Sequence, residues 1–242
     1  MKKLSLILLG TLAVIPAVEA SLFNGFYLGG QLGGTQRSDK TSTPSVDFTP
    51  ITATRFQQAA INKTNKGNGL TYGIYTGYGQ SSNGFYWGAE LSLEGDTASK
   101  TNTTKPAITI TPTLPASGTL TTKYERGMVF GITPRMGVVI GNDNLLYLKL
   151  GVEYSRDKLK GRYEGQTTGY TVSKSFTKTK SQFAFVPGIG FEKAFGKVLA
   201  RVEYGYTFGG KITSKDIITG VSGKTTVKST AHTAKLGIAY KF

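Results

Sequence analysis

Residues 198–208 read Val-Leu-Ala-Arg-Val-Glu-Tyr-Gly-Tyr-Thr-Phe and alternate between apolar and small or charged side chains. One face of an extended chain would carry Val198, Ala200, Val202, Tyr204, Tyr206 and Phe208, and the other Arg201, Glu203, Gly205 and Thr207. A period of two residues is typical of a β-strand with two unlike faces. The length also suits a tilted strand that crosses a bilayer, which needs about 9–11 residues.

Eight stretches of this kind follow one another along the chain. They lie near 24–34, 70–79, 84–95, 121–140, 145–156, 180–194, 197–209 and 230–242. The gaps between them are alternately long (35–69, 96–120, 157–179, 210–229) and short (80–83, 141–144, 195–196). An up-and-down membrane barrel has this rhythm, because every second connection lies on the same side. The sequence therefore predicts an all-β fold, an eight-stranded antiparallel up-and-down transmembrane β-barrel with four long extracellular loops and periplasmic termini.

The first twenty residues predict a cleaved signal peptide. A basic start is followed by an apolar run over 4–16 and by small residues before Ser21, which is the pattern of an export signal. Residues 21–242 then form a single barrel domain. The chain has no cysteine, which excludes a disulfide framework and a thiolate metal site. Export and a barrel together predict the outer membrane of a Gram-negative bacterium.

The glycine-rich face of these stretches predicts which side meets lipid. Glycine weakens a solvated strand, but the narrow lumen of an eight-stranded barrel requires small residues. This favours a membrane barrel over the alternative, a soluble lipocalin-like barrel. Aromatic residues support it by predicting two girdles, at the short-turn end (Phe26, Tyr78, Phe85, Trp87, Phe191, Tyr240, Phe242) and at the long-loop end (Tyr124, Tyr154, Phe183, Tyr206, Phe208). Pro134 and Pro187 predict a bulge or frayed pairing within their strands.

The inward face predicts a network of charges in the lumen. Its members are Glu90, Glu94, Glu125, Arg135, Lys149, Glu153, Glu192, Arg201, Glu203, Lys235 and Lys241. Buried carboxylates require partners, so we expect salt bridges that fill the barrel. The alternative is a narrow porin-like ion pathway, which the small diameter of eight strands disfavours.

The long gaps carry sixteen basic residues against six acidic ones. We expect ligand contacts at Arg37, Lys40, Lys63, Lys66, Lys158, Lys160, Arg162, Lys211 and Lys215. A cationic rim attracts polyanions such as lipopolysaccharide phosphates or host sulfated glycans; the alternative is a solvated surface without a ligand. Nucleic acid is not expected, because the basic residues are dispersed over different loops. Residues 107–114 also alternate and predict an outer hairpin.

The sequence predicts no enzyme, no metal and no cofactor. His232 is the only histidine, which excludes a multi-histidine metal site. Some small outer-membrane barrels that deacylate lipid A use a lipid-facing histidine with a serine two residues later. Here that position is Ala234, so the match fails and the lipid A enzyme is the least favoured alternative.

Residues 24–30, Asn-Gly-Phe-Tyr-Leu-Gly-Gly, and 235–242, Lys-Leu-Gly-Ile-Ala-Tyr-Lys-Phe, carry a family resemblance. They resemble the first and last strands of the outer-membrane β-barrel superfamily of opacity-type proteins, the outer membrane protein A barrel and rickettsial-type surface antigens. The resemblance implies a surface antigen, often an adhesin or a membrane-stabilising barrel, in contact with outer-membrane lipid, lipopolysaccharide and host receptors. Tyr240 and Phe242 resemble the signal read by the barrel-assembly machinery. An oligomeric state is not predicted.

Overall fold

The computed structural model describes residues 22–43, 46–48, 55–58, 60–105, 108–111, 117–167, 170–215 and 224–242. The predicted signal peptide lies outside these residues. The strands are β1 (Gly25–Thr43), β2 (Val46–Phe48), β3 (Arg55–Gln58), β4 (Ile61–Ser82), β5 (Phe85–Asp96), β6 (Lys100–Thr104), β7 (Ile108–Thr111), β8 (Ser117–Glu125), β9 (Val129–Ile140), β10 (Asn144–Thr167), β11 (Tyr170–Phe195), β12 (Val198–Lys215) and β13 (Lys224–Lys241). Among them there is no helix long and apolar enough to span a membrane.

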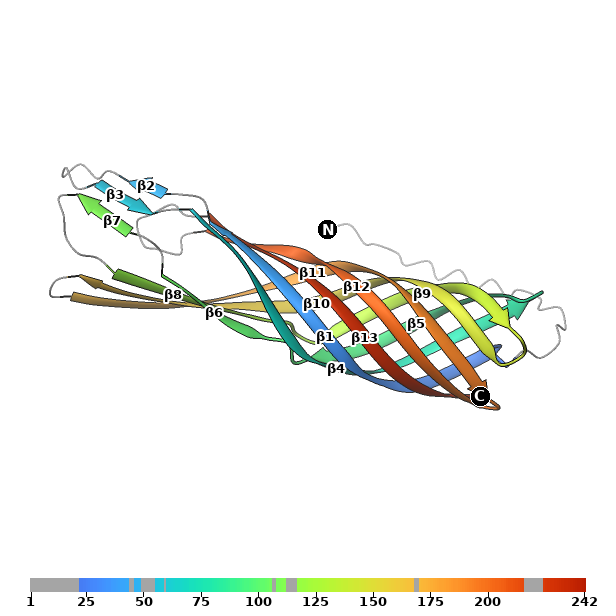
Figure 1. The fold of residues 1–242 in the computed structure, drawn as a ribbon. Coiled ribbons are helices and arrows are strands. Elements are labelled where there is room, and N and C mark those ends of the chain that lie inside the picture. Colours follow the sequence, from blue (N-terminus) through green and yellow to red (C-terminus); the bar gives the residue numbers. More distant parts are fainter. Residues whose placement is uncertain are drawn as a thin grey trace, which may run out of the picture.

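Eight of these strands form a closed antiparallel ring. The order of hydrogen-bonded neighbours is β11-β12-β13-β1-β4-β5-β9-β10, and the pairing of β10 with β11 closes it. Every neighbouring pair is antiparallel, and the strands tilt around a common axis (Figure 1). The predicted eight-stranded barrel is confirmed.

Tight turns join the strands at one end of the ring. Asn83 and Gly84 connect β4 to β5 with φ angles of 51° and 78°. Positive φ at both positions is what a two-residue hairpin of matching twist needs, and Asn-Gly adopts it readily. Gly141 and Gly196 also have positive φ, in the turns before β10 and β12. The three predicted short gaps are therefore turns, displaced by one to three residues in the first case.

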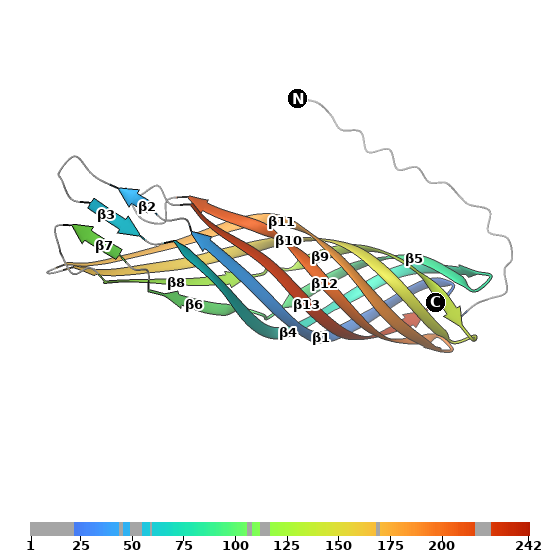
Figure 2. The ribbon, with the colours of Figure 1, turned by 45° about the horizontal axis from the view of Figure 1, so that its top comes forward.

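The strands continue well past the predicted loop boundaries on the other side. β10 has 24 residues and β11 has 26, whereas a tilted crossing needs about 9–11. Much of the predicted loops 35–69, 157–179 and 210–229 is therefore strand, because alternation and the backbone ladder continue into the polar sequence. Figure 2 shows the long strands running beyond the ring, towards the small sheet of β2, β3 and β7. β7 pairs with β3 in this sheet, so the described part of 107–114 is a strand of the small sheet and not the outer hairpin of the barrel that was predicted.

The stretch 121–140 was predicted to be one strand and is two. Residues 126–128 separate β8 from β9, and this break exchanges the two faces. Tyr124, expected in the outer girdle, is buried, and Glu125, expected in the lumen, is partly exposed. The physical reason is the period of two: three irregular residues between the strands remove any fixed relation between their faces.

The two prolines interrupt pairing without shifting it. The bridges between β9 and β10 stop at Arg135 and resume at Ile132 in the same register, and those between β11 and β12 stop at Gly188 and resume at Phe185. Frayed pairing was therefore the correct alternative. A bulge lies elsewhere, between Phe208 and Lys211 of β12.

Candidate functional site

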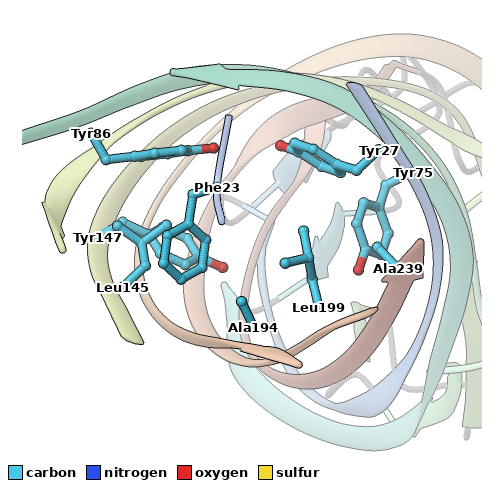
Figure 3. Close-up of a cluster of buried hydrophobic side chains, with 9 residues drawn as sticks. All are labelled: Phe23, Tyr27, Tyr75, Tyr86, Leu145, Tyr147, Ala194, Leu199 and Ala239. Atoms are coloured by element: carbon cyan, nitrogen blue, oxygen red, sulfur yellow. The ribbon is translucent and has the colours of Figure 1, made fainter. Parts of the chain in front are cut away.

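The lumen near the short turns is filled by aromatic and aliphatic side chains. Figure 3 shows the rings of Tyr27, Tyr75, Tyr86 and Tyr147 pointing inward from different strands, with Phe23 between Tyr86 and Tyr147. The cluster is completed by Leu145, Ala194, Leu199 and Ala239. All these side chains are buried, so this end of the barrel is closed by packing.

Inward glycines make room for these tyrosines. A Cβ atom on Gly77 would lie 2.5 Å from the Tyr27 hydroxyl oxygen, and one on Gly190 would lie 2.3 Å from Cζ of Tyr147. Such distances are far below van der Waals contact, so an alanine at either position would displace a ring. The glycine-rich face is therefore complementary in shape to the tyrosines. These tyrosines were not among the predicted lumen residues, although their positions opposite inward glycines were a usable signal.

Arg135 lies just beyond this layer and contacts several side chains at the centre of the lumen. Its guanidinium donates to Glu90 at 2.8 Å, to Glu192 at 2.9 Å and to the hydroxyl oxygen of Tyr27 at 3.0 Å. It also stacks 3.8 Å above the ring of Tyr147. The side chain is fully enclosed, so its charge is balanced entirely by these neighbours.

Arg201 forms the second centre of the network. It pairs with Glu90, donates to Gln31 at 2.9 Å and lies 3.5 Å above the ring of Tyr75. Glu203 lies 3.6 Å from the same guanidinium and accepts hydrogen bonds of 2.6 Å from both Lys149 and Tyr147. Glu90 thus bridges the two arginines, because one of its carboxylate oxygens, Oε1, contacts both guanidinium groups.

The polar filling continues towards the outer end. Lys235 pairs with Glu94, and Arg126 pairs with Glu153 at 2.8 Å. Above them Arg37 pairs with Asp96 and donates to the carbonyl oxygen of Ala98 at 3.1 Å. Tyr124 donates to Asp157. Ion pairs therefore occupy the barrel along most of its length.

The spaces left between these side chains are small. A cavity of about 20 Å³ lies among Glu94, Arg126, Lys149 and Lys235, and one of about 10 Å³ lies nearer the outer end, beside Arg37, Asp157 and Gln182. A single water needs about 10–15 Å³. Each of these two cavities therefore holds about one water molecule.

The structure brings together nine of the eleven residues predicted for the lumen: Glu90, Glu94, Arg135, Lys149, Glu153, Glu192, Arg201, Glu203 and Lys235. The prediction that Glu125 lies in the lumen is wrong, because this residue is on β8, outside the ring of eight strands. There it pairs with Lys123 at 3.0 Å and Lys160 at 2.8 Å, and these ammonium groups lower the pKa of its carboxyl, Lys160 most. Lys241 is half-buried beside the last turn and joins none of the ion pairs among the described residues.

Among the predicted loop contacts, the prediction for Arg37 is wrong. The alternation of β1 continues through this residue and turns it inward, so it is buried rather than exposed. The side chain of Lys215 lies outside the described residues. The remaining predicted contacts are exposed: Lys40, Lys63, Lys66, Lys158, Lys160, Arg162 and Lys211. The predictions missed Arg126, Gln31 and Asp157 in the lumen.

Beyond the aromatic girdle, the outward side chains of β10 change from apolar to basic. Tyr154 and Phe183 contact each other across β10 and β11, with ring centroids 5.2 Å apart. The next outward positions on β10 are Arg156, Lys158, Lys160 and Arg162, all exposed. At the opposite end Tyr240 and Phe242 of the expected assembly signal are exposed, with centroids 5.5 Å apart.

His232 lies on the outward face among aromatic rings. It shares a hydrogen bond of 2.6 Å with the hydroxyl group of Tyr204, and its ring lies 4.7 Å from that of Tyr206. Ala234 stands two residues later and offers no nucleophile. In the described ranges no cluster of three or more histidine, cysteine or carboxylate side chains could hold a metal ion.

Comparison with known proteins gives low identities and wide coverage. Neisserial surface protein A matches over 90% of this chain and 98% of its own, at 12% identity and a TM-score of 0.38. The Escherichia coli outer membrane protease OmpT matches over 93% and 99%, at 8% identity and a TM-score of 0.43. The Yersinia pestis attachment invasion locus protein Ail matches over 88% and 99%, at 15% identity and a TM-score of 0.32.

No curated protein sequence matches the chain. The model of the outer membrane protein beta-barrel domain, however, matches residues 4–242, and the ring of eight antiparallel strands agrees with it. A family of this kind resides in the outer membrane of Gram-negative bacteria. The chain belongs to the outer membrane protein beta-barrel family.

Proposed function

We propose that the protein is a non-enzymatic surface barrel that contacts external polyanions through the part of its wall that extends beyond the lipid. In this arrangement the short turns and both termini face the periplasm. The observation that carries the proposal is the row of outward cations on β10. Arg156, Lys158, Lys160 and Arg162 occupy four successive outward positions beyond Tyr154.

The geometry of this row suits a long anionic ligand. Outward residues on one strand are about 6.6 Å apart, so the four charges extend over about 20 Å. The neighbouring strand β11 presents Ser181, Thr179, Thr177 and Ser175 opposite them, and these hydroxyl groups can donate hydrogen bonds to sulfate or carboxylate oxygens. Among the described residues, only Lys160 and Arg162 of this row have carboxylate partners, in exposed pairs with Glu125 and Glu164. Exposed pairs are weak, so a polyanion can replace them.

The packed lumen supports a closed barrel over a narrow channel. The ion pairs of Arg135 and Arg201 cross the centre, and the cavities beyond them each hold about one water. The purified and refolded protein should therefore give no stable unitary conductance in planar bilayers. A conductance that changes in Glu203→Gln or Arg201→Gln would show an open path through the network and refute the closed lumen.

The aromatic surroundings of His232 and the alanine at position 234 support a protein without hydrolytic activity on lipid A. Lipid A from cells that overexpress the protein should therefore be unchanged. A shortened acyl pattern would contradict the non-enzymatic assignment.

Binding to immobilised heparin tests the polyanion proposal. We expect salt-sensitive retention of the purified barrel, because exposed charges are screened at physiological ionic strength. Neutralising the row with glutamine at 156, 158, 160 and 162 should weaken binding about tenfold or more. Lys193→Gln/Lys197→Gln, at the short-turn end, is the control and should bind as the unmodified protein does. Retention that is insensitive to salt, or equal in the row variant, would refute the proposal.

A further inference from the structure

A second cationic feature lies on another side of the barrel, across three strands rather than along one. Lys211 of β12 pairs in register with Lys228 of β13, which pairs in register with Lys40 of β1. We call these three residues the lysine row. All are exposed, and none makes an ion pair with the described residues. Lys180 of β11 donates to the carbonyl oxygen of Lys211 at 3.0 Å, which places a fourth ammonium group at one end.

The bulge in β12 brings Lys211 into this row. Tyr204, Tyr206 and Phe208 face outward, so an uninterrupted strand would turn Lys211 inward. The extra residue between Phe208 and Lys211 exchanges the faces. Lys211 is consequently exposed, and Ile212 is fully buried in a cluster with Val227.

Like charges directly opposite each other on neighbouring strands are destabilising. Adjacent strands are about 4.8 Å apart, so the three ammonium groups repel one another unless an anion lies among them. The nearest carboxylate on β1, Asp39, faces the lumen and is buried. The row is therefore complementary to an external group with more than one negative charge.

Aromatic side chains lie immediately below the lysine row on the same wall. The ring centroid of Tyr206 lies 4.7 Å from that of Phe208 and 4.7 Å from that of His232. Phe185 stacks with Phe208 at 6.4 Å, and Tyr204 is hydrogen-bonded to His232. We call these five residues the aromatic shelf. Amphipathic rings of this kind sit at the level of lipid headgroups.

The opposite wall lacks this combination. There the outward residues near the outer ends of β5 and β9 are Leu93 and Phe130, which are apolar, and Met128 precedes β9. The juxtaposition of aromatic and basic residues is therefore not a uniform belt around the barrel.

We propose that the lysine row and the aromatic shelf together bind one phosphorylated lipid of the surrounding outer leaflet. Its phosphate groups contact Lys211, Lys228 and Lys40, and its first ring or acyl segment packs on Tyr206 and Phe208. This site is separate from the polyanion surface of β10, because its ligand is a lipid of the membrane in which the barrel lies. Ammonium-to-phosphate pairs are charge-assisted and strong where water is partly excluded, and the headgroup region provides that setting.

Native mass spectrometry of the full-length mature protein in neutral detergent tests the site. The probes are lipid A with two phosphate groups and the same lipid after removal of both. We expect retention of the phosphorylated form and about tenfold weaker retention in Lys40→Gln/Lys211→Gln/Lys228→Gln. Lys105→Gln/Lys178→Gln/Lys197→Gln removes the same charge at exposed positions outside the lysine row and should retain the lipid. Equal loss in this control, or equal retention of the dephosphorylated lipid, would overturn the proposal.

Two further measurements separate the site from other anion binding. Tyr206→Leu/Phe208→Leu should lower lipid retention several-fold while heparin retention stays unchanged, because the shelf contacts only the lipid. Inorganic pyrophosphate should fail to displace the lipid completely; full displacement would refute a role for the shelf. If the lysine-row variant keeps the lipid but loses heparin, the row belongs to the polyanion surface and the lipid site is wrong. Loss of heparin binding by the β10 variant alone leaves this proposal intact.

Discussion

Replacing Arg135 by methionine should destabilise the barrel more than any other single change in the lumen network. Methionine keeps the length of the side chain and removes its charge. Glu192, which is 2% exposed, then loses its only ion-pair partner among the described residues, at 2.9 Å. Glu90 keeps Arg201 and the hydroxyl group of Tyr27, so its loss is smaller.

The magnitude follows from the stranded carboxylate. Removing one partner of a buried ion pair costs about 3–5 kcal/mol. Lys149→Met should cost less, because Glu203 retains Tyr147 at 2.6 Å and Arg201 at 3.6 Å. Lys158→Met changes an exposed position and should stay within about 0.5 kcal/mol.

Urea unfolding of the refolded protein in lipid vesicles measures these differences. Trp87 is the only tryptophan, and it lies half-exposed on the lipid face of β5, so its fluorescence reports the transfer from lipid to water. Glu192→Gln in the Arg135→Met background should recover most of the lost stability, because it removes the stranded charge. A cost below about 1 kcal/mol for Arg135→Met, or no recovery in the double variant, would refute a stabilising role for this ion pair.

Three other outcomes follow from the geometry. Gly190→Ala should destabilise by about 1–3 kcal/mol in the same urea assay, because its Cβ would lie 2.3 Å from Tyr147, while Gly34→Ala meets no atom within 4 Å and should be tolerated. The chain has no cysteine, so a single introduced cysteine can be labelled specifically. Maleimide should label Lys211→Cys and not Ile212→Cys, and deleting Gly209 should reverse this pattern. The same labelling before and after the deletion would contradict the role of the bulge. Lys160 and Lys123 lower the pKa of Glu125. The ion pairs of Glu125 therefore stabilise the fold above the ordinary glutamate pKa of about 4.3, and this stability is lost as the pH falls through the lower folded-state pKa. Carboxyl NMR should show a higher pKa of Glu125 in Lys160→Gln, and an unchanged titration would rule out this cause.

The wall of the barrel could be predicted from the sequence because lipid imposes a strict pattern. Each outward position within the apolar band must be hydrophobic, so the alternation of residues such as Leu146, Leu148 and Leu150 is unambiguous. The first turn was predicted less closely, since the short gap was set at 80–83 whereas the turn is Asn83-Gly84, which meets the backbone requirement of a two-residue hairpin. Inward charges could be assigned from the same parity, which placed Arg135 and Glu203 correctly.

The outer extension could not be predicted because water accepts polar residues on both faces. Beyond Tyr154 the outward residues become Arg156 and Lys158, so the contrast with the inward face weakens and the strand resembles a loop in sequence. The assignment of Glu125 failed for a related reason. Parity can be extended only through an unbroken strand, and nothing in residues 126–128 indicates how the chain turns there.

The two places where the faces are exchanged share one physical setting. Between β8 and β9 the break turns Tyr124 inward to Asp157, and in β12 the bulge turns Lys211 outward and Ile212 inward. Both lie beyond the outer aromatic residues of their wall. Within hydrocarbon an irregular ladder leaves backbone groups unsatisfied at several kcal/mol each, whereas beyond it water can satisfy them. The outer extension is therefore where this barrel can reassign side chains between lumen and surface, which explains why its proposed ligand contacts lie there while the lumen network keeps a fixed parity.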